Sequence, residues 1–154
     1  MSLYPLARPE DIELSEVVKE RFLINEEAIR EQKRVGITVD ASCLAPGLKV
    51  HTWRLPLERV LDNLFNNATK AIPESGGFLR VSTCIQNEAA LVEITNSGRI
   101  TPEEEAKIRA AEVAGRGLNI VYRFVRSMGG KVDVQVDETK NTTTFRILMT
   151  LAPS

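Results

Sequence analysis

The sequence has few of the residues that usually carry redox, zinc or acyl-transfer chemistry. It holds 2 cysteines and 1 histidine in 154 residues. Cys43 and Cys84 lack the paired spacing of a zinc site or a disulfide framework, so we expect reduced cytosolic thiols. His51 lies in an alternating segment typical of a strand, which argues against a nucleophile and histidine pair. The remaining chemistry must come from carboxamides, carboxylates, lysines, arginines and glycine loops.

An excess of one charge and long apolar runs are also missing. The 20 Lys and Arg residues oppose 21 Asp and Glu residues without a basic block, so we expect no nucleic-acid binding. The apolar stretches are only a few residues long, which predicts no membrane span, no membrane contact and no secretory signal. With 43% hydrophobic residues, the chain is predicted to form one cytoplasmic domain over residues 1–154, with residues 1–10 as a lead-in.

The apolar pattern predicts helices mixed with short strands. Apolar residues recur at helical spacing over residues 13–34, with Ser15 as a candidate N-cap, and again from Pro56 to Ile72. A short charged helix is expected over residues 101–112, and a last helix over residues 117–128. Period-two segments predict strands at residues 37–39, 48–53, 79–83, 91–95, 131–136 and 143–151. This order favours an α/β (α+β) two-layer sandwich, with a mixed, largely antiparallel sheet covered on one face by helices.

The predicted helix over residues 56–72 carries two stripes. Its apolar stripe contains Leu57, Val60, Leu61, Leu64, Phe65 and Ala68. A polar stripe of Asn63, Asn67 and Lys70 lies roughly 120° away. Asparagine is unfavourable inside helices unless something uses its side chain. The carbonyl oxygen of asparagine can ligate Mg²⁺, and a nearby lysine can neutralise a terminal phosphate, so the stripe is a candidate metal and phosphate site. The alternative interpretation is a solvated side of the helix that is rich in asparagine.

Two glycine segments favour a phosphate-binding site. Asn96, Ser97 and Gly98 end one predicted strand, and Gly115 with Gly117 leads into the last predicted helix. Glycine at a helix entrance lets backbone amides approach a phosphate, and the N-terminus of the helix adds positive potential there. Either segment alone is equally compatible with a simple loop.

Three segments, in this order, resemble the motifs of one family. The segment LERVLDNLFNNATKAI resembles the Asn box of sensor histidine kinases. VEITNSGRI resembles their first glycine box, and GRGLNIVYRFVRSMGGKVDV resembles their second. These kinases belong to the GHKL ATPase superfamily. The resemblance implies a catalytic domain that binds Mg-ATP between the Asn-box helix and a lid over residues 99–114. The domain then passes the γ-phosphate to a histidine on a separate dimerisation domain.

The resemblance assigns roles by position. Asn67 matches the family's Mg²⁺ ligand, and Lys70 its basic residue near the phosphates. Asn63 stands where related hydrolysing ATPases have a general-base Glu, so an amide there favours transfer to a protein over hydrolysis. Asn96 matches the adenine-reading Asp. The loops that would hold the nucleotide contain Gly98, Ile100, Gly115, Arg116, Gly117 and Leu118.

The chain departs from the family pattern in its first glycine box and its lid. Asn96 replaces Asp, and the uncharged carbonyl would cost about 1 kcal/mol of ATP binding. Arg99 and Ile100 follow Gly98 directly, so the box lacks its second glycine. The lid has no aromatic residue, and Arg116, which stands where an apolar residue is usual, either reaches a phosphate or stays in solvent.

The implied enzyme is a protein histidine kinase of the two-component type, with its dimerisation domain and a response regulator as partners. Since His51 directly precedes the Asn-box helix, we expect the phosphoacceptor histidine to lie outside this chain. The departures leave open a degenerate regulatory or protein-interaction module and, ranked lower, an anti-sigma-factor serine kinase. The segment over residues 102–112 has little apolar surface to bury and is expected to move when nucleotide is absent.

Overall fold

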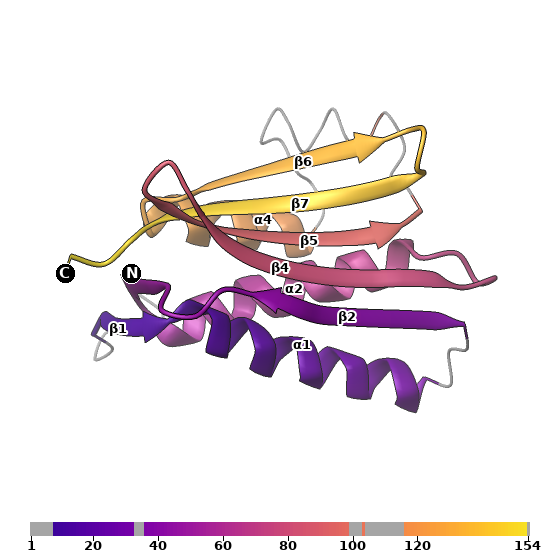
Figure 1. Ribbon diagram of the computed structural model, residues 1–154, viewed down its shortest axis with the longest axis horizontal. Coiled ribbons are helices and arrows are strands. Elements are labelled where there is room, and N and C mark those ends of the chain that lie inside the picture. Colours follow the sequence, from indigo (N-terminus) through magenta and orange to yellow (C-terminus); the bar gives the residue numbers. More distant parts are fainter. Residues whose placement is uncertain (1–7, 33–35, 99–102, 104–115, 154) are drawn as a thin grey trace.

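The chain folds into a sheet with helices on one side, as Figure 1 shows for the computed structural model. The structure describes residues 8–32, 36–98, 103 and 116–153. The helices named here are α1 (Leu14–Glu31), α2 (Arg54–Ala71) and α4 (Arg116–Ser127). The strands are β1 (Glu10–Glu13), β2 (Ile37–Leu44), β3 (Lys49–Thr52), β4 (Gly77–Gln86), β5 (Ala89–Ser97), β6 (Lys131–Asp137) and β7 (Thr142–Thr150).

Five strands form one mixed sheet in the order β2-β4-β5-β7-β6. Strand β2 runs parallel to β4, and the other neighbours are antiparallel. Strands β1 and β3 form a separate antiparallel pair, which meets the C-terminal segment through a bridge between Val50 and Leu151. The predicted two-layer α/β fold, with a largely antiparallel sheet and helices on one face, is therefore confirmed.

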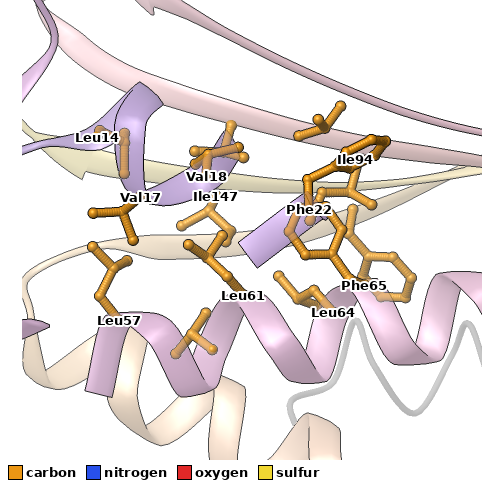
Figure 2. Close-up of a cluster of buried hydrophobic side chains, with 14 of the residues drawn as sticks. Leu14, Val17, Val18, Phe22, Leu57, Leu61, Leu64, Phe65, Ile94 and Ile147 are labelled. Carbon is orange, nitrogen blue, oxygen red and sulfur yellow. The ribbon is translucent and has the colours of Figure 1, made fainter. Parts of the chain in front are cut away.

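The core lies between the sheet and the helices. The apolar stripes of α1 and α2 pack together and against residues of the sheet such as Ile94 and Ile147 (Figure 2). Phe22 and Phe65 meet edge to face, with ring centroids 5.5 Å apart, which is a favoured aromatic geometry. All residues of the predicted apolar stripe of α2 are buried: Leu57, Val60, Leu61, Leu64, Phe65 and Ala68. This burial decides which face of α2 is left for polar chemistry.

The start of α1 differs from the prediction. Ser15 is not the N-cap, because it lies inside the first turn and its hydroxyl donates to the carbonyl oxygen of Ala45. The cap is Glu13, whose carboxylate accepts from the N–H of Glu16 at 3.0 Å and from the N–H of Leu48 at 3.1 Å. A glutamate with two backbone donors within reach thus replaces the serine that local sequence rules prefer.

One proline lies in the first turn of α2 and another follows its last turn. The helix begins at Arg54, two residues before the predicted Pro56, and proline is tolerated there because N–H groups of the first turn have no helical partner. It ends at Ala71, because Ile72 precedes Pro73 and adopts the extended conformation that this position favours. The predicted helix is therefore confirmed, with its start moved by two residues.

Strands β4 and β5 form an antiparallel hairpin. Asn87 and Glu88 have φ angles of 51° and 65°, which suit a two-residue turn that matches the twist of the strands. The helix predicted over residues 101–112 falls almost entirely outside the described residues. Among the helices in the described ranges, none is long and apolar enough to cross a membrane.

Candidate functional site

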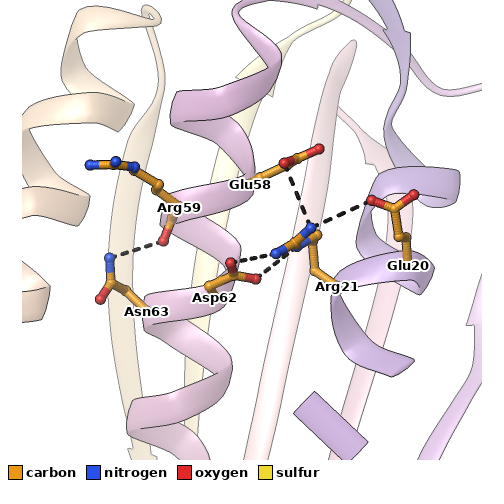
Figure 3. A network of polar contacts seen from close by, with 6 residues as sticks. All are labelled: Glu20, Arg21, Glu58, Arg59, Asp62 and Asn63. Carbon is orange, nitrogen blue, oxygen red and sulfur yellow. Dashed lines mark hydrogen bonds and ion pairs between the residues drawn. The ribbon is translucent and has the colours of Figure 1, made fainter. Parts of the chain in front are cut away.

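The polar stripe predicted for α2 lies on one face of the observed helix. Asn63 and Asn67 are half-buried and Lys70 is exposed. Because they are spaced by four and then three residues, their side chains leave the helix in neighbouring directions. Figure 3 shows Asn63 and Arg59 on the side of α2 away from Arg21 of α1. The stripe therefore remains outside the contact between the two helices.

Asn63 uses its amide nitrogen within the helix. Nδ2 donates to the carbonyl oxygen of Arg59 at 2.9 Å, one turn earlier (Figure 3). This bond leaves Oδ1 as the group that can meet a ligand, and a carboxamide oxygen can only accept. Such an oxygen can bind a cation or orient a bound water, but it cannot take a proton from water as a carboxylate can.

The opposite side of α2 is tied to α1 by an ion pair. Arg21 Nε donates to Asp62 Oδ1 at 2.8 Å, and Nη2 donates to Oδ2 at 2.7 Å (Figure 3). Glu58 adds a longer contact of 3.6 Å to Nη1. The hydrogen bonds to Asp62 raise the pKa of Arg21 above its ordinary value, so the guanidinium stays charged. Both carboxylates are turned toward Arg21, away from the side on which Asn63 lies.

The end of β5 lies against the end of α2. Gly98 has a φ of 91°, and any Cβ atom at this position would clash with the carbonyl oxygen of Ala71. Glycine alone allows this backbone approach. The N–H of Gly98 also donates to the carbonyl oxygen of Asn141 at 2.7 Å, which fixes it to the turn between β6 and β7. The structure thus brings the first glycine segment beside the end of the helix that carries Lys70.

Asn96 presents a buried acceptor at this junction. Its side chain is 0% exposed, and Nδ2 donates to the carbonyl oxygen of Ser97 at 2.8 Å. Oδ1 is buried and has no hydrogen-bond partner in the part of the chain that the structure describes. A buried acceptor left unpaired costs about 1–3 kcal/mol, so this oxygen fits a donor group on a ligand. The amino group of adenine is such a donor, and the residues present therefore fit an adenine nucleotide.

Thr143 also belongs to this junction, although the sequence analysis did not single it out. It is the register partner of Asn96 on β7, it is 0% exposed, and its Oγ1 donates to the carbonyl oxygen of Gly98 at 3.1 Å. The alternation of buried and exposed residues along β7 could have identified Thr143 from the sequence. Thr143 occupies the face that continues through Phe145 and Ile147, so it is a polar residue in a buried apolar row.

Comparison with known proteins decides the family. The family model described as histidine kinase-, DNA gyrase B- and HSP90-like ATPase matches residues 54–153. The chain belongs to this ATPase family. The matched range begins with α2 and includes β5 and β7, so it contains the asparagine stripe and the junction around Asn96.

Several proteins similar to this chain are named as sensor proteins or histidine kinases. The alginate biosynthesis sensor protein KinB of Pseudomonas aeruginosa is 26% identical over 88% of this chain and 23% of its own length. The nucleotide-free catalytic domain of histidine kinase ThkA is 25% identical, with a TM-score of 0.78 over 96% of this chain and 99% of that domain. ThkA in complex with the response regulator protein TrrA matches with a TM-score of 0.77, 25% identity and coverage of 94% and 42%. The chain spans 23% to 30% of the length of the curated relatives it matches.

The second glycine segment of this ATPase domain is described only in part. Helix α4 begins at Arg116, one residue before the predicted start, so Arg116, Gly117 and Leu118 form its first turn. Ile100, Gly115 and the lid over residues 99–114 lie outside the described residues. The structure places Gly98 against the end of α2, the helix that carries Asn63, Asn67 and Lys70, and Asn96 lies two residues before Gly98. The roles of these residues stay predictions.

A magnesium site in this ATPase domain would need few protein ligands. Mg²⁺ is usually held by one or two protein oxygens together with substrate phosphates and water, and the carbonyl oxygen of Asn67 suits that donor set. Within the described ranges, no group of three or more His, Cys, Asp or Glu side chains could hold a metal ion.

A separate hollow lies on the other face of the sheet. It has a volume of about 730 Å³, and its lining includes Phe78, Arg80, Thr95 and Thr144. Thr95 and Thr144 precede and follow Asn96 and Thr143, so the alternation of the strands directs them away from the helices. This hollow is thus distinct from the junction around Asn96.

Proposed function

We propose that the chain is the ATP-binding catalytic domain of a two-component sensor histidine kinase. It binds Mg-ATP and donates the γ-phosphate to a histidine on a separate dimerisation domain. The observation that carries the proposal is the buried Oδ1 of Asn96, which has no hydrogen-bond partner among the described residues, beside the end of the asparagine-bearing helix. Membership of the ATPase family and the likeness to ThkA support it.

Each residue has a role in the proposed site. Asn67 provides a carbonyl oxygen to Mg²⁺, and Asn63 adds a second acceptor one turn earlier. Lys70, which is exposed, neutralises charge on the phosphates. Asn96 accepts from the adenine amino group, and Gly98 lets the chain pass closely over α2. Bound ATP supplies the transferable phosphoryl group.

The arrangement of carboxylates on α2 favours transfer over hydrolysis. The residue at the family's general-base position is Asn63, whose amide cannot deprotonate water. The nearby carboxylates of Glu58 and Asp62 are paired with Arg21 on another side of the helix (Figure 3). The γ-phosphoryl group of bound ATP is therefore transferred to a nucleophile outside this domain, the histidine of the dimerisation domain, in preference to water.

The partners follow from the same proposal. The domain docks on a dimerisation domain that carries the phosphoacceptor histidine, and a response regulator receives the phosphate. The complex of ThkA with its response regulator supports the second partner. We place the domain in the cytoplasm, treat residues 1–154 as one domain, and assign the lid to residues 99–114, including Ile100 and Gly115. Arg116, Gly117 and Leu118 complete the loop at its far end.

Isothermal titration with Mg-ADP tests the site, using two neighbouring asparagines as a matched pair. Asn67→Ala is expected to weaken binding at least about tenfold, because a charge-assisted contact is lost. Asn66→Ala makes the same chemical change on an exposed position beside it and should bind like the unmodified chain. When EDTA removes Mg²⁺, the difference between the two variants should disappear.

The outcomes separate the alternatives. No heat at millimolar Mg-ADP would overturn the proposal in favour of the degenerate regulatory module. Equal affinity of both variants would remove Asn67 from the site. For the transfer step, radiolabelled ATP should label a histidine of the dimerisation domain, while label on a serine of an antagonist protein would favour the anti-sigma-factor kinase.

A further inference from the structure

Strand β6 forms one edge of the five-stranded sheet. It is the last strand in the order of the sheet, and among the described residues it pairs only with β7 (Figure 1). All 7 of its residues are in register with β7, without a bulge. An edge strand of this kind presents a row of backbone N–H and C=O groups with which a further strand can pair.

The opposite edge, strand β2, is irregular. Its register with β4 shifts between Asp40 and Cys43. At this irregularity, Asp40 Oδ1 accepts from the N–H of Ser42 at 2.9 Å and from its hydroxyl group at 2.6 Å. A bulge and a backbone donor that is already in use both hinder the addition of a strand. The regular β6 is therefore the edge that is better suited to strand addition.

The side chains of β6 form two rows. The row that faces the helices consists of Val132, Val134 and Val136. The outer row consists of Lys131, Asp133, Gln135 and Asp137. Val134 is buried in the core, and the other two valines are half-buried. The outer row begins with a positive charge and ends with a negative one, so β6 is complementary to an antiparallel copy of itself.

We propose that β6 pairs with β6 of a second copy of this chain, antiparallel and with Val134 opposite Val134 of the partner. In this register Lys131 lies opposite the partner's Asp137 at both ends of the strand pair. Opposite charges directly across an antiparallel pair stabilise it. The two five-stranded sheets join into one, with the helices of both copies on the same side. This inference goes beyond the proposed function, because it does not involve the nucleotide site.

The helix-facing row also fits the proposed register. Val132 lies opposite the partner's Val136, so the apolar row continues from one copy into the other. A hollow of about 230 Å³ lies between α4 and the start of β6, and its lining includes Tyr122, Val125 and Val132. The partner's Val136 lies beside this hollow and can bury its side chain there.

Other antiparallel registers are disfavoured by the same side chains. A shift by one residue turns the valine row of one copy to the outer face of the joined sheet. A shift by two residues places Asp133 opposite the partner's Asp133 in one direction and opposite the partner's Asp137 in the other. Like charges directly opposite each other are destabilising. In the proposed register Asp133 lies opposite the partner's Gln135, whose amide can donate to a carboxylate.

Sedimentation velocity of the chain without nucleotide, from micromolar to millimolar concentration, tests the pairing. The unmodified chain is expected to pass from monomer to dimer over this range. Lys131→Glu should weaken the dimer at least about tenfold, because both end pairs become like-charged. Lys19→Glu makes the same charge change on an exposed residue of α1, far from β6, and should leave the equilibrium unchanged (Figure 1).

A double variant tests the register itself. Lys131→Glu combined with Asp137→Lys exchanges the two charges, so each end pair is again of opposite sign and the dimer should be restored. Circular dichroism checks the fold of this variant, because Asp137 Oδ1 accepts from the N–H of Lys140 at 3.0 Å and the substitution removes that hydrogen bond.

Hydrogen exchange of the unmodified chain locates the contact without a substitution. In an antiparallel pair, alternate residues direct their N–H groups toward the added strand. Every second amide of β6 should therefore exchange more slowly at high than at low chain concentration, while the amides of β2 should not change. Uniform behaviour of β2 and β6 would contradict the pairing whether or not the double variant folds.

The remaining outcomes are equally decisive. A chain that stays monomeric at millimolar concentration would overturn the proposal, and this is the result expected if β6 instead receives a strand of a different protein. A dimer that Lys131→Glu leaves intact, or that a folded double variant fails to restore, would also overturn it. Titration with Mg-ADP measures the proposed function separately, so either proposal can fail without the other.

Discussion

Gly98 and Gly47 have similar backbone conformations but different surroundings. Their φ angles are 91° and 75°, yet a Cβ atom would clash with Ala71 at Gly98 and meet nothing within 4 Å at Gly47. The φ cost of an alanine is shared by the two sites, at roughly 1–2 kcal/mol each. The difference in destabilisation between alanine at Gly98 and alanine at Gly47 therefore measures the contact between the end of β5 and α2.

We predict that Gly98→Ala is at least about 2 kcal/mol more destabilising than Gly47→Ala, because relieving the clash must move the end of β5 or α2. Urea unfolding of both variants measures this difference. Equal losses of stability would show that the β5 end and α2 are not in close contact.

Asn96→Asp is predicted to destabilise the free chain at neutral pH. The new carboxylate would be buried against the carbonyls of Ser97 and Gly98, at a cost of about 1–3 kcal/mol. Burial raises the pKa of that carboxyl, so the folded state favours its protonated form. The variant should then approach the stability of the unmodified chain at low pH and lose it as pH rises through the raised pKa. Thermal unfolding from pH 4 to pH 7 tests this, and equal stability of the two chains at pH 7 would contradict it.

The sequence predicted Asn96, Asn63 and Asn67 as site residues but not the orientation of their amides. Local rules state that asparagine is costly in a helix, which led to the stripe on α2. They do not state that Asn63 Nδ2 is used by Arg59 or that Asn96 faces two carbonyls. Those facts depend on backbone positions that only the folded chain supplies.

The contact between α1 and α2 is fixed at one point by Arg21 and Asp62. The side chain of Arg21 is 18% exposed and that of Asp62 is 43% exposed, so solvent screens the pair in part. The bidentate geometry and the additional contact to Glu58 favour a measurable contribution.

We predict that Asp62→Asn destabilises the chain by about 1 kcal/mol, because one charged acceptor of a mostly buried guanidinium is lost. Glu20→Gln is the control, since Glu20 lies 3.6 Å from Arg21 and its side chain is 57% exposed. Its effect should stay within about 0.5 kcal/mol. Equal effects of the two substitutions in urea unfolding would contradict the bidentate clamp.

Helix and strand positions were largely predictable, while their ends were not. The period of α2 indicated its buried face correctly, since residues such as Leu61 and Leu64 are fully buried. The prediction of Ser15 as the N-cap of α1 was wrong, because the observed cap, Glu13, is fixed partly by Leu48, which is distant in sequence. Long-range partners thus decide details that a local pattern leaves open.

At the scale of the whole molecule, the order of the sheet could not be predicted from the sequence. Strand β2 pairs in parallel with β4, although β3 and α2 lie between them in the sequence. Strand β5 pairs with β7, although α4 and β6 lie between them. These pairings join residues far apart in the chain, and many arrangements share the same local pattern. The order of the predicted helices and strands indicated the fold class, and the order of the motifs matched a family, but neither revealed which strands pair.

The arrangement of layers gives the two faces of the sheet separate roles. The face toward the helices buries the core and ends at Asn96 and Thr143, beside the end of α2. The opposite face carries the hollow near Phe78 and Arg80. A nucleotide that binds as we propose must therefore affect the first face and leave the second unchanged.

Nuclear magnetic resonance titration of the ¹⁵N-labelled chain with Mg-ADP tests this central claim most directly. The account predicts saturable shifts of the amide resonances of Asn67, Asn96, Gly98 and Thr143, with little change at Phe78 and Arg80. No shift at millimolar Mg-ADP, or shifts confined to the face around Arg80, would contradict it.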